Sequence, residues 1–162
     1  MEPEVRHLTA DEVCATWGPL VVRICDGRRT ELEDLQRVEA IFDELLTRHR
    51  HVGILLVFHH GTPMPAGPTQ RYAMDSTRRF GERLVMSAAL LGLGFWADAT
   101  RATLSTLLRL VGATLSIESS VEQAVARLTL DFVGIDPDAL MTVYRDLWQQ
   151  LQTEQANQAQ AS

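Results

Sequence analysis

The chain has 162 residues, of which 46% are hydrophobic and 22% are charged, and this is enough for one globular domain with a buried core. Its formal net charge of -6 argues against nucleic-acid binding, which needs a basic face, and all 15 basic residues are arginine, which excludes lysine chemistry such as Schiff-base formation. No apolar run reaches the roughly 18 residues that cross a bilayer, and the polar N-terminus lacks the features of a signal peptide. We therefore expect a cytoplasmic protein.

The first predicted elements are two short strands around Gly18 and Pro19, the second covering residues 20–25. Cys14 and Cys25 lie in these strands without the CxxC spacing of a metal or redox site. We interpret both cysteines as small buried hydrophobic residues.

The next segment predicts a helix and then a central strand. Thr30 and Glu33 fit a capping box, and apolar residues then recur at steps of three and four through residue 46. The run "HVGILLVF" is apolar on both faces, which is typical of a strand covered on both sides.

Helices and strands continue to alternate toward the C-terminus. The pattern predicts a helix over 68–83, a strand in "RLVMSAALLG", a helix in "FWADATRATLSTLLRLVG" and a short strand in "ATLSIE". Ser119 and Glu122 fit a second capping box, and Asp136 followed by Pro137 predicts the start of an amphipathic helix that ends near 152.

These elements predict a layered α/β fold with a mixed, largely parallel sheet of about five strands and covering helices. We expect one α/β domain over 1–133, an added C-terminal helix over 134–152 and a frayed tail over 153–162, because the tail has almost no apolar residues.

The order of elements and several runs, among them "VGILLVFHH", "PTQRYAMDSTRRF" and "ESSVEQAVARL", resemble the STAS and SpoIIAA-like superfamily, which includes anti-sigma-factor antagonists and a SEC14-like branch. The resemblance covers roughly residues 12–130. It implies a non-enzymatic bacterial regulatory or adaptor protein that binds another protein, such as a regulator or a kinase.

The resemblance also implies a partner-binding loop after the central strand. The serine-containing loop of STAS switches is replaced by "HHGTPMPAGPT", in which Thr69 is the nearest candidate phosphosite. The predicted partner-binding residues are His59, His60, Thr62, Thr69 and Arg71. A small-molecule or lipid site is the alternative function, with an apolar pocket lined by Met64, Met74, Met86, Phe95 and Trp96.

Other kinds of site have weaker support. His49 and His51 lie a strand's length from His59 and His60, so we expect no metal site. The spacing of Gly92, Gly94 and Ala97 resembles a dinucleotide turn, with Glu118 as its acidic residue, but bulky aromatic residues occupy this turn. We expect no cofactor and no enzymatic activity, because the sequence has no G-x-S-x-G motif and neither cysteine has an obvious basic neighbour.

The C-terminal helix also predicts a contact surface. Its apolar stripe must pack on the same domain, which is the favoured interpretation, or on a second copy in a homodimer. The candidate oligomer face comprises Leu140, Tyr144, Leu147, Trp148 and Leu151.

Overall fold

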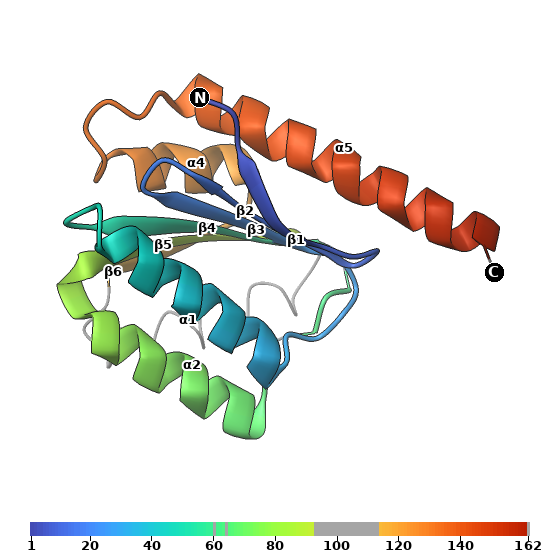
Figure 1. The fold of residues 1–162 in the computed structure, drawn as a ribbon, viewed down its shortest axis with the longest axis horizontal. Coiled ribbons are helices and arrows are strands. Elements are labelled where there is room, and N and C mark those ends of the chain that lie inside the picture. The colour runs from blue at the N-terminus through green and yellow to red at the C-terminus, as the bar shows by residue number, and fades with distance from the viewer. Residues whose placement is uncertain (60, 64, 93–113, 162) are drawn as a thin grey trace.

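The computed structural model describes residues 1–59, 61–63, 65–92 and 114–161. It confirms the predicted α/β class, with helices on both faces of one mixed sheet (Figure 1). The elements run in the order β1 Glu4–Leu8, β2 Glu12–Trp17, β3 Leu20–Cys25, α1 Leu32–Leu46, β4 Val52–Phe58, α2 Gly67–Phe80, a 3-10 turn Gly81–Arg83, β5 Leu84–Leu90, β6 Thr114–Glu118, α4 Val121–Thr129 and α5 Pro137–Ala161.

Within the described ranges, the sheet has six strands, which lie in sequence order. The first three pair antiparallel, and β3 to β6 pair parallel. The turn at Gly18, which has φ +58°, joins β2 and β3 as predicted. The edge strand β1 was not predicted, because its residues are polar and largely exposed rather than alternating.

Among the described elements, α1 and α2 cover one face of the sheet, and α4 and α5 cover the other (Figure 1). Successive residues of a strand point to opposite faces, and this separates two cores. On one face, Leu55 of β4 belongs to the cluster beneath α4 and α5, whereas its neighbour Ile54 packs with Val38 and Phe42 of α1 on the other face. Cys14 and Cys25 are buried free thiols, as expected.

The helix starts differ in part from the prediction. Helix α1 has Glu31 as its N-cap, which forms a capping box with Asp34, because the Thr30 hydroxyl accepts a hydrogen bond from Arg23 instead. Helix α4 is capped by Ser120, whose hydroxyl accepts from the backbone N–H of Gln123, and not by Ser119.

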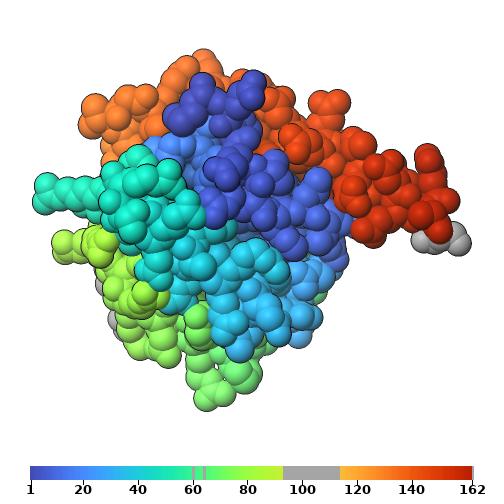
Figure 2. Space-filling view, in the orientation of Figure 1, coloured from blue at the N-terminus to red at the C-terminus, as the bar shows by residue number. Residues whose placement is uncertain are grey.

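Helix α5 begins at Pro137, with Asp136 accepting a hydrogen bond from the backbone of Asp138, as predicted. The helix continues to Ala161, past its predicted end near 152, and its last turns extend beyond the body of the domain (Figure 2). Gln155 contributes to this continuation by donating a 2.7 Å hydrogen bond to Asp26.

Candidate functional site

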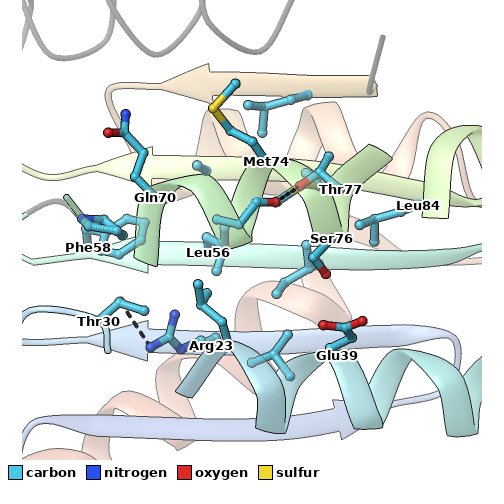
Figure 3. A pocket seen from close by; sticks show the side chains of 18 of the residues that line it. Arg23, Thr30, Glu39, Leu56, Phe58, Gln70, Met74, Ser76, Thr77 and Leu84 are labelled. Carbon is cyan, nitrogen blue, oxygen red and sulfur yellow. Dashed lines mark hydrogen bonds between the residues drawn. The ribbon is translucent and has the colours of Figure 1, made fainter. Parts of the chain in front are cut away.

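A cavity of about 170 Å³ lies between helices α1 and α2 and the sheet (Figure 3). Strands β3 to β6 form its floor and the two helices form its walls. The residues that line it are Arg23, Thr30, Leu35, Val38, Glu39, Phe42, Ile54, Leu56, Phe58, Pro65, Gln70, Ala73, Met74, Ser76, Thr77, Leu84, Met86, Ala88, Leu90, Leu115 and Ile117.

The period of the strands explains why the floor is apolar. Alternate residues of β4, β5 and β6 face the same side of the sheet, so that Leu56, Met86 and Ile117 lie on one surface. Helix α2 places few side chains against this floor, because it is a polar helix in which only Thr77 and Phe80 are buried. A polar helix over an apolar floor leaves the space that the cavity occupies.

One charged side chain reaches the cavity from the sheet. Arg23, in the middle of β3, is only 2% exposed. Its Nε donates to Glu12 Oε1 at 3.1 Å, and its Nη2 donates to Glu12 Oε2 at 2.9 Å and to Thr30 Oγ1 at 3.1 Å. Figure 3 shows the bond to Thr30 on one side of the guanidinium, while another of its nitrogens points toward Leu56.

Arg23 belongs to a larger ionic cluster, of which Arg28 and Arg37 are partly exposed. Asp34, which is 2% exposed, accepts two hydrogen bonds of 2.8 Å from Arg28 and one of 3.2 Å from Arg37. The same two arginines lie 3.5 Å and 3.8 Å from Glu12. The ionic cluster therefore comprises Glu12, Arg23, Arg28, Asp34 and Arg37.

The surroundings of Arg23 and Asp34 favour their charged forms. Burial alone would lower the pKa of Arg23, but the hydrogen bonds and charge of Glu12 are among the interactions that raise this pKa above its ordinary value. Burial would raise the pKa of Asp34, but the backbone N–H of Glu31 and the Arg28 guanidinium lower it by more, so the pKa lies below its usual range. The cavity therefore borders a fixed charge.

Polar side chains also join helices α1 and α2 to each other beside the cavity. Glu39 of α1 accepts hydrogen bonds from Tyr72 and Arg79 of α2, and Arg79 also pairs bidentately with Asp43 at 2.8 and 2.9 Å. Glu39 thus lines the cavity with its charge already paired, whereas Thr77 donates its hydroxyl to the Ala73 carbonyl at 2.7 Å.

The described residues of the predicted partner-binding loop do not form one surface. His59 stacks on Trp148 with ring centroids 3.7 Å apart, and its Nε2 lies 3.3 Å from the Tyr144 hydroxyl, on the α5 side of the sheet. Thr62 accepts from the Gly27 N–H at 2.9 Å and donates to the Cys25 carbonyl at 3.2 Å, which is a structural role.

The other loop residues lie elsewhere or are not described. Thr69 lies within α2, which begins at Gly67 with Ala66 as its N-cap, so this threonine does not cap the helix. Arg71 is exposed on the same helix, on the face of the sheet opposite His59. His60 lies outside the described residues.

The candidate oligomer face is mostly internal. Leu140, Leu147 and Leu151 are fully buried in the cluster beneath α4 and α5, and Tyr144 and Trp148 are partly buried against it. The prediction that α5 packs on its own domain is confirmed. The homodimer stays a prediction.

The structure partly supports the predicted pocket. Met74 and Met86 line the cavity, while Met64, Phe95 and Trp96 lie outside the described residues. Sequence reasoning missed Arg23 and Glu12. A charged residue within the apolar run "LVVRIC", together with a residue of opposite charge at the start of the neighbouring strand "EVCATW", was the signal that could have revealed them.

Metal and nucleotide sites gain no further support. In the described ranges, no group of three or more His, Cys, Asp or Glu side chains is placed to hold a metal ion. Gly94 and Ala97 of the dinucleotide-like turn lie outside these ranges, although Glu118 does end β6. Across the same part of the chain, no helix has the length and apolar character needed to cross a membrane.

Comparison with known proteins identifies no relative. No family model, curated protein or solved structure matches the chain. The resemblance to the STAS superfamily therefore stays a prediction.

Proposed function

We propose that this chain is a non-enzymatic binding protein whose cavity between α1, α2 and the sheet holds a small apolar molecule. The observation that carries the proposal is the cavity itself, an apolar space of about 170 Å³ with one buried charged group at its edge. Apolar pockets with a few placed polar groups are the usual form of small-molecule sites.

The volume limits what the cavity can enclose. An engineered apolar cavity of about 150 Å³ stays dry and binds benzene, so this slightly larger cavity suits a ring or chain of roughly six to eight non-hydrogen atoms. A long lipid does not fit within this volume, although a short acyl or aromatic group does. For so small a ligand, we expect a Kd on the order of 0.1–1 mM.

Thermal unfolding with toluene tests this proposal. At about ten times its Kd, a ligand that binds only the folded chain adds about 1.4 kcal/mol, which corresponds to a Tm increase of roughly 3–6 °C. Ala88 faces the cavity from β5 and is 6% exposed, so Ala88→Leu fills the space without touching a charge. Ala126→Leu, on the exposed surface of α4, adds the same atoms elsewhere.

The expected result is a Tm increase with toluene for the wild-type chain and Ala126→Leu, and a much smaller one for Ala88→Leu. An equal response of all three chains, or none from any, overturns the proposal. Binding of a regulatory protein partner at the segment after β4 stays a prediction, in which Arg71 is the exposed candidate contact.

A further inference from the structure

We propose that the molecule in the cavity is uncharged and carries a carbonyl oxygen, which accepts a hydrogen bond from Nη1 of Arg23. This inference rests on the proposed function and deepens it by naming the chemical class of the ligand: a small neutral carbonyl compound, such as an aldehyde or a ketone, with an apolar body. It follows from the hydrogen bonds of Arg23, from the partners of the other polar groups in the cavity wall and from the charges beside the cavity.

The first observation is a buried donor that has no acceptor. Arg23 is 2% exposed, and its Nε and Nη2 atoms donate to Glu12 and Thr30. Its Nη1 atom makes no hydrogen bond among the described residues, although a terminal guanidinium nitrogen carries two N–H groups. Arg23 lines the cavity, and Figure 3 shows a guanidinium nitrogen directed toward Leu56, apart from the one that is bonded to Thr30. Because a buried donor without a partner is unfavourable, an acceptor in the cavity is stabilised there.

The other polar groups in the cavity wall differ from Arg23. The Thr77 hydroxyl donates to a backbone carbonyl of its own helix, and the Glu39 carboxylate accepts from two side chains of α2. Gln70 and Ser76 are partly exposed, so water hydrates them. Among the described side chains of the cavity, Arg23 is therefore the buried group that has donors left over. Most of the remaining lining is apolar, which favours a ligand with one acceptor on an apolar body.

The charges beside the cavity favour a neutral ligand. The side chains of Glu12, Arg23 and Asp34 are each 3% exposed, and they carry two negative charges and one positive charge. Glu39 adds a further carboxylate to the cavity wall. These carboxylates repel an anion at Nη1, and Arg23 itself repels a cation. A carbonyl oxygen accepts the same hydrogen bond without adding a charge.

The volume defines the probe molecules. A cavity of about 170 Å³ encloses a ring with one short substituent, and benzaldehyde is a ligand of this size. Styrene has the same planar shape, with a CH₂ group in place of the carbonyl oxygen, so the two ligands differ in the acceptor. The chain has no lysine, so the aldehyde forms no Schiff base with a side chain.

Calorimetric titration with benzaldehyde, styrene and benzoate at pH 7 tests the inference. We expect the wild-type chain to bind benzaldehyde at least as tightly as styrene, because the bond to Arg23 offsets the cost of removing the carbonyl from water. Without that bond, the more apolar styrene binds more tightly. Benzoate should bind more weakly than benzaldehyde. Ala88→Leu should lose all three ligands, whereas Ala126→Leu should bind them as the wild type does.

A double variant, Glu12→Gln with Arg23→Met, removes the donor together with its buried counter-charge. We expect the ratio of benzaldehyde affinity to styrene affinity to fall about tenfold in this variant. Its affinity for toluene should stay within about threefold of the wild-type value, which also shows that it folds.

Infrared spectroscopy of benzaldehyde bound to the wild-type chain needs no variant. The carbonyl stretching band should lie at a lower frequency than in hexane, because a hydrogen bond weakens the C=O bond. This band and the three titrations of the wild-type chain decide the question even if the double variant does not fold.

The outcomes separate the two proposals. Binding of toluene and styrene with weaker binding of benzaldehyde, or a bound carbonyl band at its position in hexane, overturns the carbonyl inference and leaves the proposed function standing. Tighter binding of benzoate than of benzaldehyde overturns the neutral class of the ligand. An unchanged affinity ratio in the folded double variant overturns the assignment to Arg23. Binding of none of the ligands overturns both proposals.

Discussion

Arg23 Nη2 and Glu12 Oε2 lie 2.9 Å apart across the β2–β3 hairpin, and each side chain is only 3% exposed. Cys14 is the residue directly opposite Arg23, so Glu12 is its diagonal neighbour on the same face of the sheet. Two charges in this position depend on each other, because neither can reach bulk water.

Removing one member of this pair should destabilise the fold strongly. Arg23→Met alone leaves the Glu12 carboxylate without its closest partner in the core and should cost about 3–5 kcal/mol. The double variant Glu12→Gln with Arg23→Met should cost less than the single variant, because no buried charge loses its counter-ion. Urea unfolding measures both. Equal losses for the single and the double variant would show that the two charges do not depend on each other.

Asp34 should make stability depend on acidic pH. Its folded pKa lies below the unfolded value of about 3.9, because the backbone of Glu31 and the Arg28 guanidinium outweigh burial. Its contribution is therefore fully present above about pH 4 and is lost as the pH falls through the lower folded pKa. Asp34→Asn should lower the free energy of unfolding at pH 7 and flatten the decline of this free energy below about pH 4. Asp75→Asn, at an exposed carboxylate, is the control. A parallel decline in Asp34→Asn and the wild type would contradict this assignment.

The two cysteines should be inert in the folded protein. Burial raises the pKa of Cys14 to about 12 and that of Cys25 to about 11, despite the opposing charge of Arg23. Iodoacetamide at pH 8 should therefore alkylate neither thiol in the native state and both in urea, as measured by mass spectrometry. Because the folded pKa values are raised, the two protonated thiols contribute fully to the free energy of unfolding below the unfolded pKa of about 8.5. This contribution is lost as the pH rises through 11 and 12. Rapid native alkylation would contradict the buried positions.

Truncation should separate the essential part of α5 from its extension. A chain that ends at Ile135 loses Leu140, Leu147 and Leu151, which are fully buried, and should not fold. A chain that ends at Gln152 loses only exposed or partly exposed residues and the Gln155–Asp26 hydrogen bond, so its free energy of unfolding should fall by about 1 kcal/mol. Circular dichroism during urea unfolding measures both chains. A stable, folded chain ending at Ile135 would show instead that α5 is dispensable for the core.

The sequence predicted those parts of the fold that local pattern determines. The run of β4 is apolar on both faces, and Asp136 before Pro137 specifies a helix start, so both elements lie where predicted. Strand β1 could not be recognised, because an exposed edge strand has no alternation of apolar and polar residues. Thr30 fitted a capping box but is used by Arg23, a partner that only the tertiary structure brings to it.

The candidate site was less predictable than the fold. The methionines of the cavity, Met74 and Met86, were recognised as apolar, but apolar residues at such spacing are more often core. A cavity depends on how closely the helices pack on the sheet. The local pattern of "PTQRYAMDSTRRF" predicts the helix but not how closely it packs. The role of Arg23 depends on the register between β2 and β3, which sequence spacing alone does not define.

The most direct test of ligand binding in the cavity is a nuclear magnetic resonance titration of the chain labelled with ¹³C at its methionine methyl groups, with toluene as the ligand. Met74 and Met86 line the cavity, whereas Met141 lies in the cluster on the other face of the sheet and Met1 is 83% exposed. We predict saturable shifts of the Met74 and Met86 signals, assigned with Met→Leu variants, and no shift of Met1 or Met141. Unchanged Met74 and Met86 signals at saturating toluene, or equal shifts of Met141, would contradict the proposed site.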